Sequence, residues 1–191
     1  LKVADLAASR KGQALGLIAY AGSAHLVLPP TRDTAVVAQM AAEISPSIMP
    51  TRGDRLDLAI AKAGEILNAD DLGGRILVIA DSVDVDPASA KDAHLATGRL
   101  PVHFLTINRP DSAGTESIRR VARDLKAPVE QLTADDSDIQ AIIRTAARAP
   151  MRSTGNTDAR WHDAGYWLTP VLALLVALSF RRTQPHTPAR A

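Results

Sequence analysis

The sequence RILVIADSVDVD, residues 75–86, reads as a buried strand that stops at a carboxylate, Asp81. A run of about five apolar residues, rich in Ile and Val and closed by polar residues, is typical of a parallel strand covered on both faces. In open α/β sheets, ligands bind in the crevice at the carboxyl ends of the strands. Asp81 is therefore either a candidate ligand-binding residue or a cap for the helix that we expect near Pro87.

Strands and helices alternate along the rest of the chain. We expect strands at residues 14–20, 24–28, 76–80, 102–107 and 129–132, and helices at 1–10, 34–44, 55–68, 87–97, 114–125 and 135–148. The first two strands flank a short Gly-containing turn and should form an antiparallel hairpin, which Pro29 and Pro30 end. This order predicts an α/β fold with a mostly parallel sheet, one antiparallel edge strand and helices on both faces.

Short polar side chains precede two of these helices. Either Thr31 or Asp33 can cap the helix at 34–44, and Asp54 stands directly before the helix at 55–68. The intervening segment SPSIMPTRGD, residues 45–54, is rich in Pro, Ser and Gly and predicts a loop.

Composition excludes several classes of function. The chain has 22 Lys and Arg against 21 Asp and Glu, so it lacks the basic excess that nucleic-acid binding requires. Aromatic residues make up 3% of the chain, too few for base-stacking surfaces. The absence of cysteine excludes disulfides, thiolate metal sites and cysteine nucleophiles.

One segment near the C-terminus carries a membrane signal. GYWLTPVLALLVALSF, residues 165–180, has no charge and is followed by Arg181 and Arg182. Its length is at the short end for a transmembrane helix, which needs about 17–25 apolar residues. The flanking arginines predict a tail in the cytoplasm and a globular domain on the opposite side of the membrane. We therefore expect a domain at 1–148, a linker at 149–163, a transmembrane helix at 164–182 and a short tail at 183–191.

Five segments in register carry a family resemblance. They are LGLIAYAGSAHLVLPPTRD at 15–33, MPTRGDRLDLAI at 49–60, RILVIADSVD at 75–84, VHFLTIN at 102–108 and WHDAGYWLTPVLALLVALSFRR at 161–182. With them the chain resembles a von Willebrand factor A (VWA) domain of the membrane-anchored bacterial aerotolerance (Bat) type. The resemblance implies a Rossmann-like VWA fold, from which we expect the first strand, with its DxSxS motif, to be missing.

The resemblance also implies a metal site. In the family, Mg²⁺ lies at the carboxyl edge of the sheet in a metal-ion-dependent adhesion site, and a carboxylate from a partner completes its coordination. Asp81 matches the family's Asp after the fourth strand, and Asp54 stands where the family carries Thr. Asp54 is therefore either a substituted ligand or the cap of its helix. Without the DxSxS motif, three expected ligand side chains are lacking, so the implied Mg²⁺ site is degenerate.

The function implied by the resemblance is that of a protein–protein interaction module anchored in the bacterial inner membrane, with its globular domain on the periplasmic side. Its partner-binding loops would present Thr51, Arg52, Ser82 and Asp84. Related VWA membrane proteins are encoded beside a MoxR-type ATPase, so the implied partners are other VWA membrane proteins or a MoxR-type ATPase system, in assembly or stress tolerance of the envelope. A VWA scaffold that binds no metal is the alternative.

An enzyme is the remaining alternative, either a hydrolase or a nucleotide-binding protein on a doubly wound sheet. The five histidines show no metal-ligand spacing, and His25 and His103 alternate with apolar residues in strands, as packed or surface residues do. No G-x-S-x-G elbow frames Ser23, and Gly73 and Gly74 precede a strand, so they form no phosphate loop. We therefore expect no enzymatic activity.

Overall fold

The computed structural model describes residues 2–10, 12–69, 73–135, 137–148, 173 and 176–178, with the side chains of 146–148 left out. The chain divides into two compact units, Leu1–Arg152 and Ser153–Ala191. The first unit contains all the strands that the structure describes.

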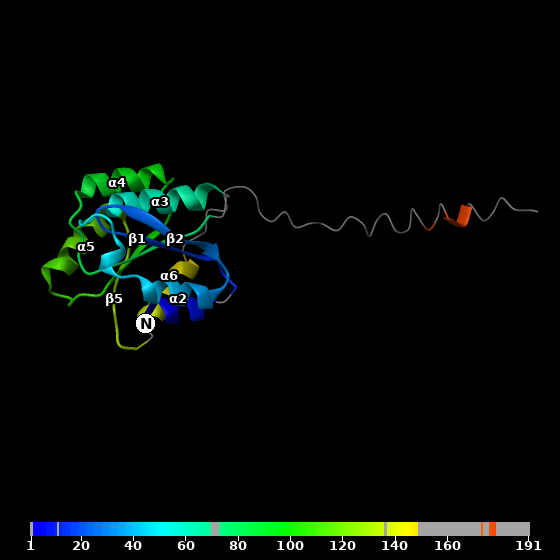
Figure 1. The fold of residues 1–191 in the computed structure, drawn as a ribbon, viewed down its shortest axis with the longest axis horizontal. Coiled ribbons are helices and arrows are strands. Elements are labelled where there is room, and N and C mark those ends of the chain that lie inside the picture. The colour runs from blue at the N-terminus through cyan, green and yellow to red at the C-terminus, as the bar shows by residue number, and fades with distance from the viewer. Residues whose placement is uncertain are drawn as a thin grey trace, which may run out of the picture. The chain divides into compact units, whose positions relative to one another are not determined.

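The elements of the first unit follow the predicted order. They are α1 (Lys2–Ser9), β1 (Leu15–Tyr20), β2 (Ala24–Thr31), α2 (Thr34–Glu43), the 3-10 helix η1 (Pro46–Ile48), α3 (Leu56–Ala69), β3 (Ile76–Ala80), α4 (Pro87–Ala96), β4 (Val102–Thr106), α5 (Ala113–Leu125), β5 (Val129–Gln131) and α6 (Ser137–Arg148). Figure 1 shows α3 and α4 on one side of the strands and α2 and α6 on the other. The α/β class and the helices on both faces are therefore confirmed.

The strands form two sheets, whereas the sequence predicted one. β3, β4 and β5 make a parallel sheet in that order, and β1 and β2 make a separate antiparallel pair. The predicted antiparallel edge strand is thus wrong, because in the described residues the hairpin strands are hydrogen-bonded only to each other. A tight turn brings β1 and β2 together, so their pairing can be predicted from neighbouring residues. Whether the hairpin also pairs with β3 depends on segments that are distant in the chain.

β2 extends beyond its predicted end. The hairpin was expected to stop at Pro29 and Pro30, but the strand continues to Thr31, which pairs with Leu15. Proline removes a backbone donor, yet it is tolerated in edge strands and at bulges. The register of this two-stranded sheet shifts on both sides of Leu17, so the prolines lie where the pairing is already irregular.

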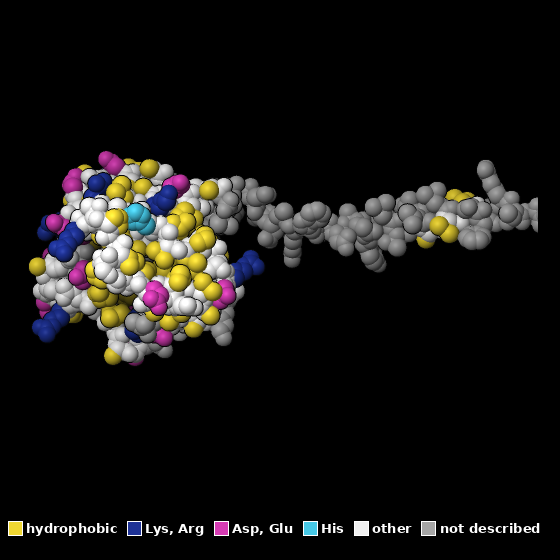
Figure 2. Space-filling model, in the orientation of Figure 1, with side chains coloured by type: hydrophobic (Ala, Val, Ile, Leu, Met, Phe, Trp, Pro, Cys, Tyr) yellow, Lys and Arg dark blue, Asp and Glu magenta, His cyan; other side chains and the backbone are white. Residues whose placement is uncertain are grey.

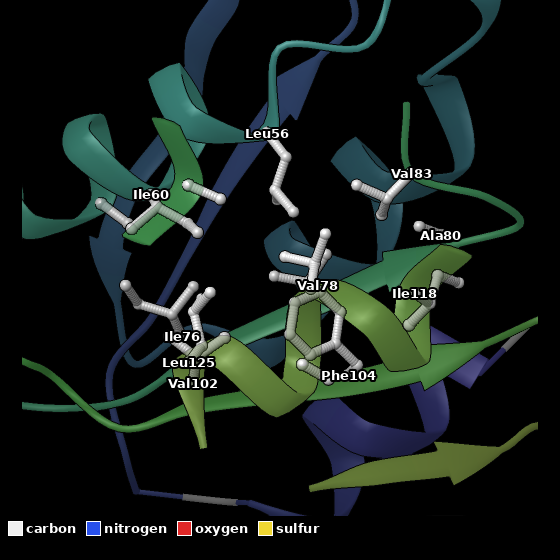
Figure 3. Packing of buried hydrophobic residues seen from close by; sticks show 14 residues of the cluster. Leu56, Ile60, Ile76, Val78, Ala80, Val83, Val102, Phe104, Ile118 and Leu125 are labelled. Carbon is white, nitrogen blue, oxygen red and sulfur yellow. The ribbon is translucent and has the colours of Figure 1, made fainter. Parts of the chain in front are cut away.

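The main core lies between the parallel sheet and the helices α3 and α5. Figure 3 shows Val78 and Phe104 at its centre, with Leu56 of α3 and Ile118 of α5 pointing toward them. Phe104 and Leu56 are completely buried. Leu105 points to the opposite face of the strand and is buried as well, so β4 is covered on both faces.

Helix caps follow the short polar side chains. Asp33, and not Thr31, caps α2, because its carboxylate accepts from the N–H groups of Ala35 and Val36. Asp86 caps α4 in the same way through Ala88. Asp81 therefore does not cap α4.

The predicted transmembrane helix at 164–182 requires correction. Among the described residues, no helix is long and apolar enough to cross a membrane. Of the predicted span, only Ala173 and residues 176–178 are described, and they are helical. The remainder of the span, the linker at 149–163 and the tail at 183–191 lie outside the described residues. The uncharged stretch lies at the lower limit of length for a membrane helix, so hydropathy alone could not decide the question.

Apolar side chains also reach the surface of the first unit. Figure 2 shows hydrophobic side chains gathered over the part of the face where β1, β2 and α2 lie in Figure 1. Leu26 of β2 is 41% exposed and Val36 of α2 is 38% exposed. β2 has a partner strand on one side only and contains no fully buried residue, in contrast to β3 and β4 of the parallel sheet.

Candidate functional site

The carboxyl edge of the parallel sheet joins the residues that follow β3 and β4. Asp81 follows β3 directly and is exposed. Asn108 lies two residues beyond β4, and its Nδ2 donates to the backbone oxygen of Asp81 over 3.4 Å. The backbone N–H of Ile107 donates to the oxygen of Ala80 over 3.1 Å. Asp81 therefore lies at the edge where the strand pattern placed it.

Asp54 connects the loop before α3 to the loop after β3. Its Oδ2 accepts from the backbone N–H of Asp84 over 2.6 Å, and the backbone of Leu56 at the start of α3 also donates to its carboxylate. Its Oδ1 is buried and has no hydrogen-bond partner among the described residues. A buried acceptor without a partner costs about 1–3 kcal/mol, so Asp54 brings an unsatisfied oxygen to this edge.

The surroundings of Asp54 disfavour its ionised form. Burial raises the pKa of Asp54, and the charges of Asp84 and Asp81 raise it further, although the donated N–H groups partly offset both effects. Burial also raises the pKa of the Tyr20 hydroxyl, and the charges of Asp54 and Asp81 add to this effect. Tyr20 ends β1, so a hairpin strand and two loops contribute to one negatively charged region.

The sequence analysis missed Tyr20 and Asn108. Asn108 carried a usable signal, because it is the first amide side chain after β4 and so occupies the same edge as Asp81. Tyr20 carried none, because in the sequence it is only the last residue of an apolar strand.

The four residues predicted to bind a partner lie on the same two loops. Thr51 and Arg52 are exposed before α3, and Ser82 and Asp84 are exposed after β3. The hydrogen bond between Asp54 and the Asp84 backbone joins these loops. The structure therefore brings the four residues to one region of the surface, and their role in binding stays a prediction.

The tip of the hairpin fixes the loop that carries Asp54. The N–H of Gly22 donates to the oxygen of Thr51 over 3.0 Å, and the N–H of Arg55 donates to the oxygen of Ala21 over 2.7 Å. A Cβ atom on Gly22 would lie 2.5 Å from the backbone oxygen of Arg52. Only glycine allows this approach, so the hairpin positions Asp54 from a distance in the sequence.

The start of α5 fixes the loop that carries Asp81 in a similar way. A Cβ atom on Gly114 would collide with the backbone oxygen of Asp81 and with Nδ2 of Asn108. The N–H of Val83 donates to Oγ of Ser117 over 2.9 Å. The backbone around Asp81 is therefore held by α5.

The oxygen donors of this edge fit a hard cation in type. Asp54 and Asp81 offer carboxylates, and Oδ1 of Asp54 lacks a partner among the described residues. Mg²⁺ prefers oxygen ligands and usually keeps several of its waters, so it needs few protein ligands. In the described part of the chain, no group of three or more His, Cys, Asp or Glu is placed to hold a metal ion. The donor set is thus a partial one.

The two histidines of the strands behave as packing and surface residues. His103 on β4 is 9% exposed, and burial lowers its pKa, with a further contribution from the charge of Arg75. His25 on β2 is exposed, and its Nε2 lies 2.8 Å from Oγ of Ser23. His162 and His186 lie outside the described residues.

The raised pKa of Asp54 predicts that Asp54→Asn stabilises the protein at pH 7. The folded state binds the Asp54 proton more tightly than the unfolded state, so ionisation of Asp54 costs stability above its folded pKa. We expect a higher melting temperature at pH 7, because asparagine keeps an acceptor for the N–H of Asp84 and removes the charge repulsion. The gain should shrink as the pH falls through the folded pKa toward about 4.

Asp57→Asn is the matched control, since its sign is opposite. The side chain of Arg55 donates to both oxygens of Asp57, at 2.9 and 2.7 Å, and holds the pKa of Asp57 below its usual range. Asp57→Asn should therefore destabilise the protein at pH 7. Thermal melts of both variants between pH 4 and 8 measure the difference, and a loss of stability in Asp54→Asn at pH 7 would contradict the prediction.

Comparison with known proteins places this fold. Residues 2–83 match the von Willebrand factor type A domain family. No curated protein matches the chain significantly. The structure is similar to that of the conserved hypothetical protein BatB from Bacteroides thetaiotaomicron, with a TM-score of 0.64 and 21% identity over 77% of this chain and 85% of that one.

Two further solved structures share the fold. An aerotolerance-related membrane protein from Bacteroides fragilis gives a TM-score of 0.63 at 20% identity, again over 77% of this chain and 85% of that one. A von Willebrand factor type A protein from Catenulispora acidiphila gives 0.54 at 17% identity, over 81% of this chain and 37% of that one. The family match over residues 2–83 and the shared fold confirm the resemblance seen in the sequence: this chain is similar to von Willebrand factor type A domains, including those of Bat-type proteins.

Proposed function

We propose that this VWA domain is a protein–protein interaction module that uses the carboxyl edge of its parallel sheet. The observation that carries the proposal is Oδ1 of Asp54, a buried oxygen without a hydrogen-bond partner among the described residues. It belongs to a carboxylate whose pKa is raised by burial and by the neighbouring charges of Asp84 and Asp81. A positive charge brought to this edge relieves both penalties, so binding is favoured here over other parts of the surface.

Mg²⁺ is the cation that we propose for this edge. Asp81 and Asp54 are its protein ligands, and water and a partner's carboxylate supply the remaining oxygens. The ion would neutralise the edge and make a negatively charged partner group acceptable there. The exposed residues Thr51, Arg52 and Ser82 surround the site and contact the partner.

Titration of Mg²⁺ or Mn²⁺ into the full chain tests the metal directly. We expect heat in calorimetry and an increase in melting temperature, because a ligand that binds only the folded state stabilises it. Asp81→Asn should abolish both signals. Asp92→Asn, which removes an exposed carboxylate on α4, should leave both unchanged. If wild-type protein shows neither heat nor a melting shift, the metal site is rejected.

A metal-independent VWA scaffold is the second candidate. The charge-relieving group at the edge would then be a basic side chain of the partner, paired with Asp54 and Asp81. Binding that survives EDTA but is lost on Asp81→Asn would select this candidate. No turnover is expected with generic esters, phosphates or nucleotides, and an activity abolished by a single substitution would contradict the non-enzymatic proposal.

We propose partners from the class implied by the resemblance, either other VWA membrane proteins or a MoxR-type ATPase system that acts in envelope assembly or stress tolerance. The similarity to an aerotolerance-related membrane protein supports this choice. A photo-crosslinking residue placed at Arg52 should capture the purified partner, whereas one placed at Asp92 on α4 should not. Equal capture from both positions would contradict binding at the carboxyl edge.

We also propose that the protein associates with a membrane, because one structural relative is a membrane protein. Fractionation of cells that express the full chain is the test. Recovery in the membrane fraction after a high-salt wash is expected, and recovery only in the supernatant would reject association. The periplasmic side for the domain stays a prediction from the sequence.

A further inference from the structure

β5 (Val129–Gln131) is the last strand of the parallel sheet, and its outer edge is free of other strands in the described part of the chain. Phe104 pairs with Val129, and the N–H of Phe104 donates to the oxygen of Pro128 over 2.9 Å. In a parallel ladder with this register, the backbone N–H and C=O groups of Val129 point away from β4. The backbone groups of Gln131, two residues further along, point away from β4 as well. Within the described part of the chain, no strand lies beyond β5. Its outward backbone groups are therefore available for pairing.

A hollow of about 220 Å³ opens beside this edge, between α5 and the start of β5. It is lined by Glu116, Arg119, Ala122, Arg123, Ala127 and Val129. Three of these side chains are apolar and three are charged, so the hollow combines an apolar floor with a charged rim. Val129 belongs both to the hollow and to the free edge. A strand added beside Val129 would place every second side chain on the face of the sheet that α5 covers.

The charge around the hollow is predominantly positive. Four cationic side chains on and just after α5 are exposed, against two carboxylates: Arg119, Arg120, Arg123 and Lys126, with Glu116 and Asp124. Figure 2 shows charged side chains at the left of the molecule, where α5 lies in Figure 1. This excess favours an acidic ligand.

Glu116 now occupies the rim, where it meets both arginines of the hollow. Its carboxylate lies 3.2 Å from Arg123 and 3.8 Å from Arg119. All three side chains are largely exposed, and ion pairs of this kind contribute about 0–1 kcal/mol. An incoming carboxylate can therefore replace Glu116 at low cost.

We propose that the free edge of β5 accepts an extended acidic segment of a partner protein as an added strand, with a Glu or Asp side chain in the hollow between Arg119 and Arg123. Strand addition of this kind takes its affinity from main-chain hydrogen bonds and its specificity from side-chain pockets. A second copy of this chain is disfavoured, because pairing β5 with β5 would bring two cationic α5 faces together. This surface is independent of the carboxyl-edge site, since the two share no residue.

A short fluorescent peptide in which valine alternates with glutamate tests the proposal on the full chain by anisotropy. We expect a Kd of about 10–100 μM, and no binding of the matched peptide in which lysine replaces glutamate. Arg123→Glu should weaken binding at least about tenfold. Arg120→Glu makes the same charge change outside the hollow and should weaken binding much less than Arg123→Glu does. Glu116→Gln should strengthen binding by removing the competing carboxylate.

The backbone part of the proposal has its own test. Val129→Pro removes the outward N–H while leaving the hydrogen bonds to β4 in place, so it should abolish binding, whereas Val129→Ile should not. If Val129→Pro lowers the circular dichroism signal, the variant has lost folded structure, and the effect of Arg123→Glu on peptide binding then tests the proposal. The proposal is overturned if the lysine peptide binds as tightly as the glutamate peptide, or if Arg120→Glu loses as much affinity as Arg123→Glu. It is also overturned if β5 pairs with β5 of a second copy of this chain, which would appear as a dimer that the peptide dissociates. Failure of Mg²⁺ binding would leave it untouched.

Discussion

Replacing Phe104 by alanine is expected to lower the free energy of unfolding by about 3–5 kcal/mol. Phe104 is completely buried on β4, the central strand of the parallel sheet, between Leu56 of α3 and Ile118 of α5. Truncation removes the apolar ring from the core and leaves a cavity. β4 is hydrogen-bonded to β3 on one side and to β5 on the other, so it cannot shift to close this cavity. Urea denaturation monitored by circular dichroism measures the loss as a lower transition midpoint.

Ile107→Ala is the matched control for this prediction. Ile107 lies three residues further along the chain, just past β4, and is 50% exposed. Truncation there should cost less than about 1 kcal/mol, since little apolar area leaves the core. A similar loss in both variants would contradict the placement of Phe104 at the centre of the core.

Gly22→Ala is expected to destabilise the protein by about 1–3 kcal/mol and to weaken the proposed binding of Mg²⁺ at the carboxyl edge. The added methyl group would meet the backbone oxygen of Arg52 at 2.5 Å and Cγ2 of Thr51 at 2.8 Å. Backbone cannot yield as a flexible side chain does, so the loop must move away from the hairpin and carry Asp54 with it. Urea denaturation measures the first effect and calorimetry the second.

Gly16→Ala provides the control within the same hairpin. A Cβ atom there would lie 3.4 Å from the oxygen of Leu28 and from the nitrogen of Pro30, which is close to ordinary contact. We expect a change below about 0.5 kcal/mol and unaltered Mg²⁺ binding. If Gly22→Ala kept full stability, the proposed positioning of Asp54 by the hairpin would be wrong.

Part of the candidate site was predictable from local sequence. Asp81 could be found because it is the first polar residue after an apolar strand, and the same rule, applied to β4, would have identified Asn108. Asp54 was predictable as a residue of interest, but its hydrogen bond to the Asp84 backbone joins positions far apart in the chain. Tyr20 could not be found, because only its burial beside two carboxylates gives it importance.

The sequence by itself determined the order of strands and helices, the hairpin, the parallel character of the main sheet, and the position of Asp81 at the carboxyl edge. These features follow from the periodicity of apolar residues and from turn residues, which act over a few positions. The tertiary structure alone decided that the hairpin forms a separate sheet and that its tip holds the Asp54 loop. It alone left one oxygen of Asp54 buried without a partner in the described chain. Those features depend on which segments, distant in the sequence, pack against each other and bury each other's side chains. A local sequence pattern carries no information about that packing.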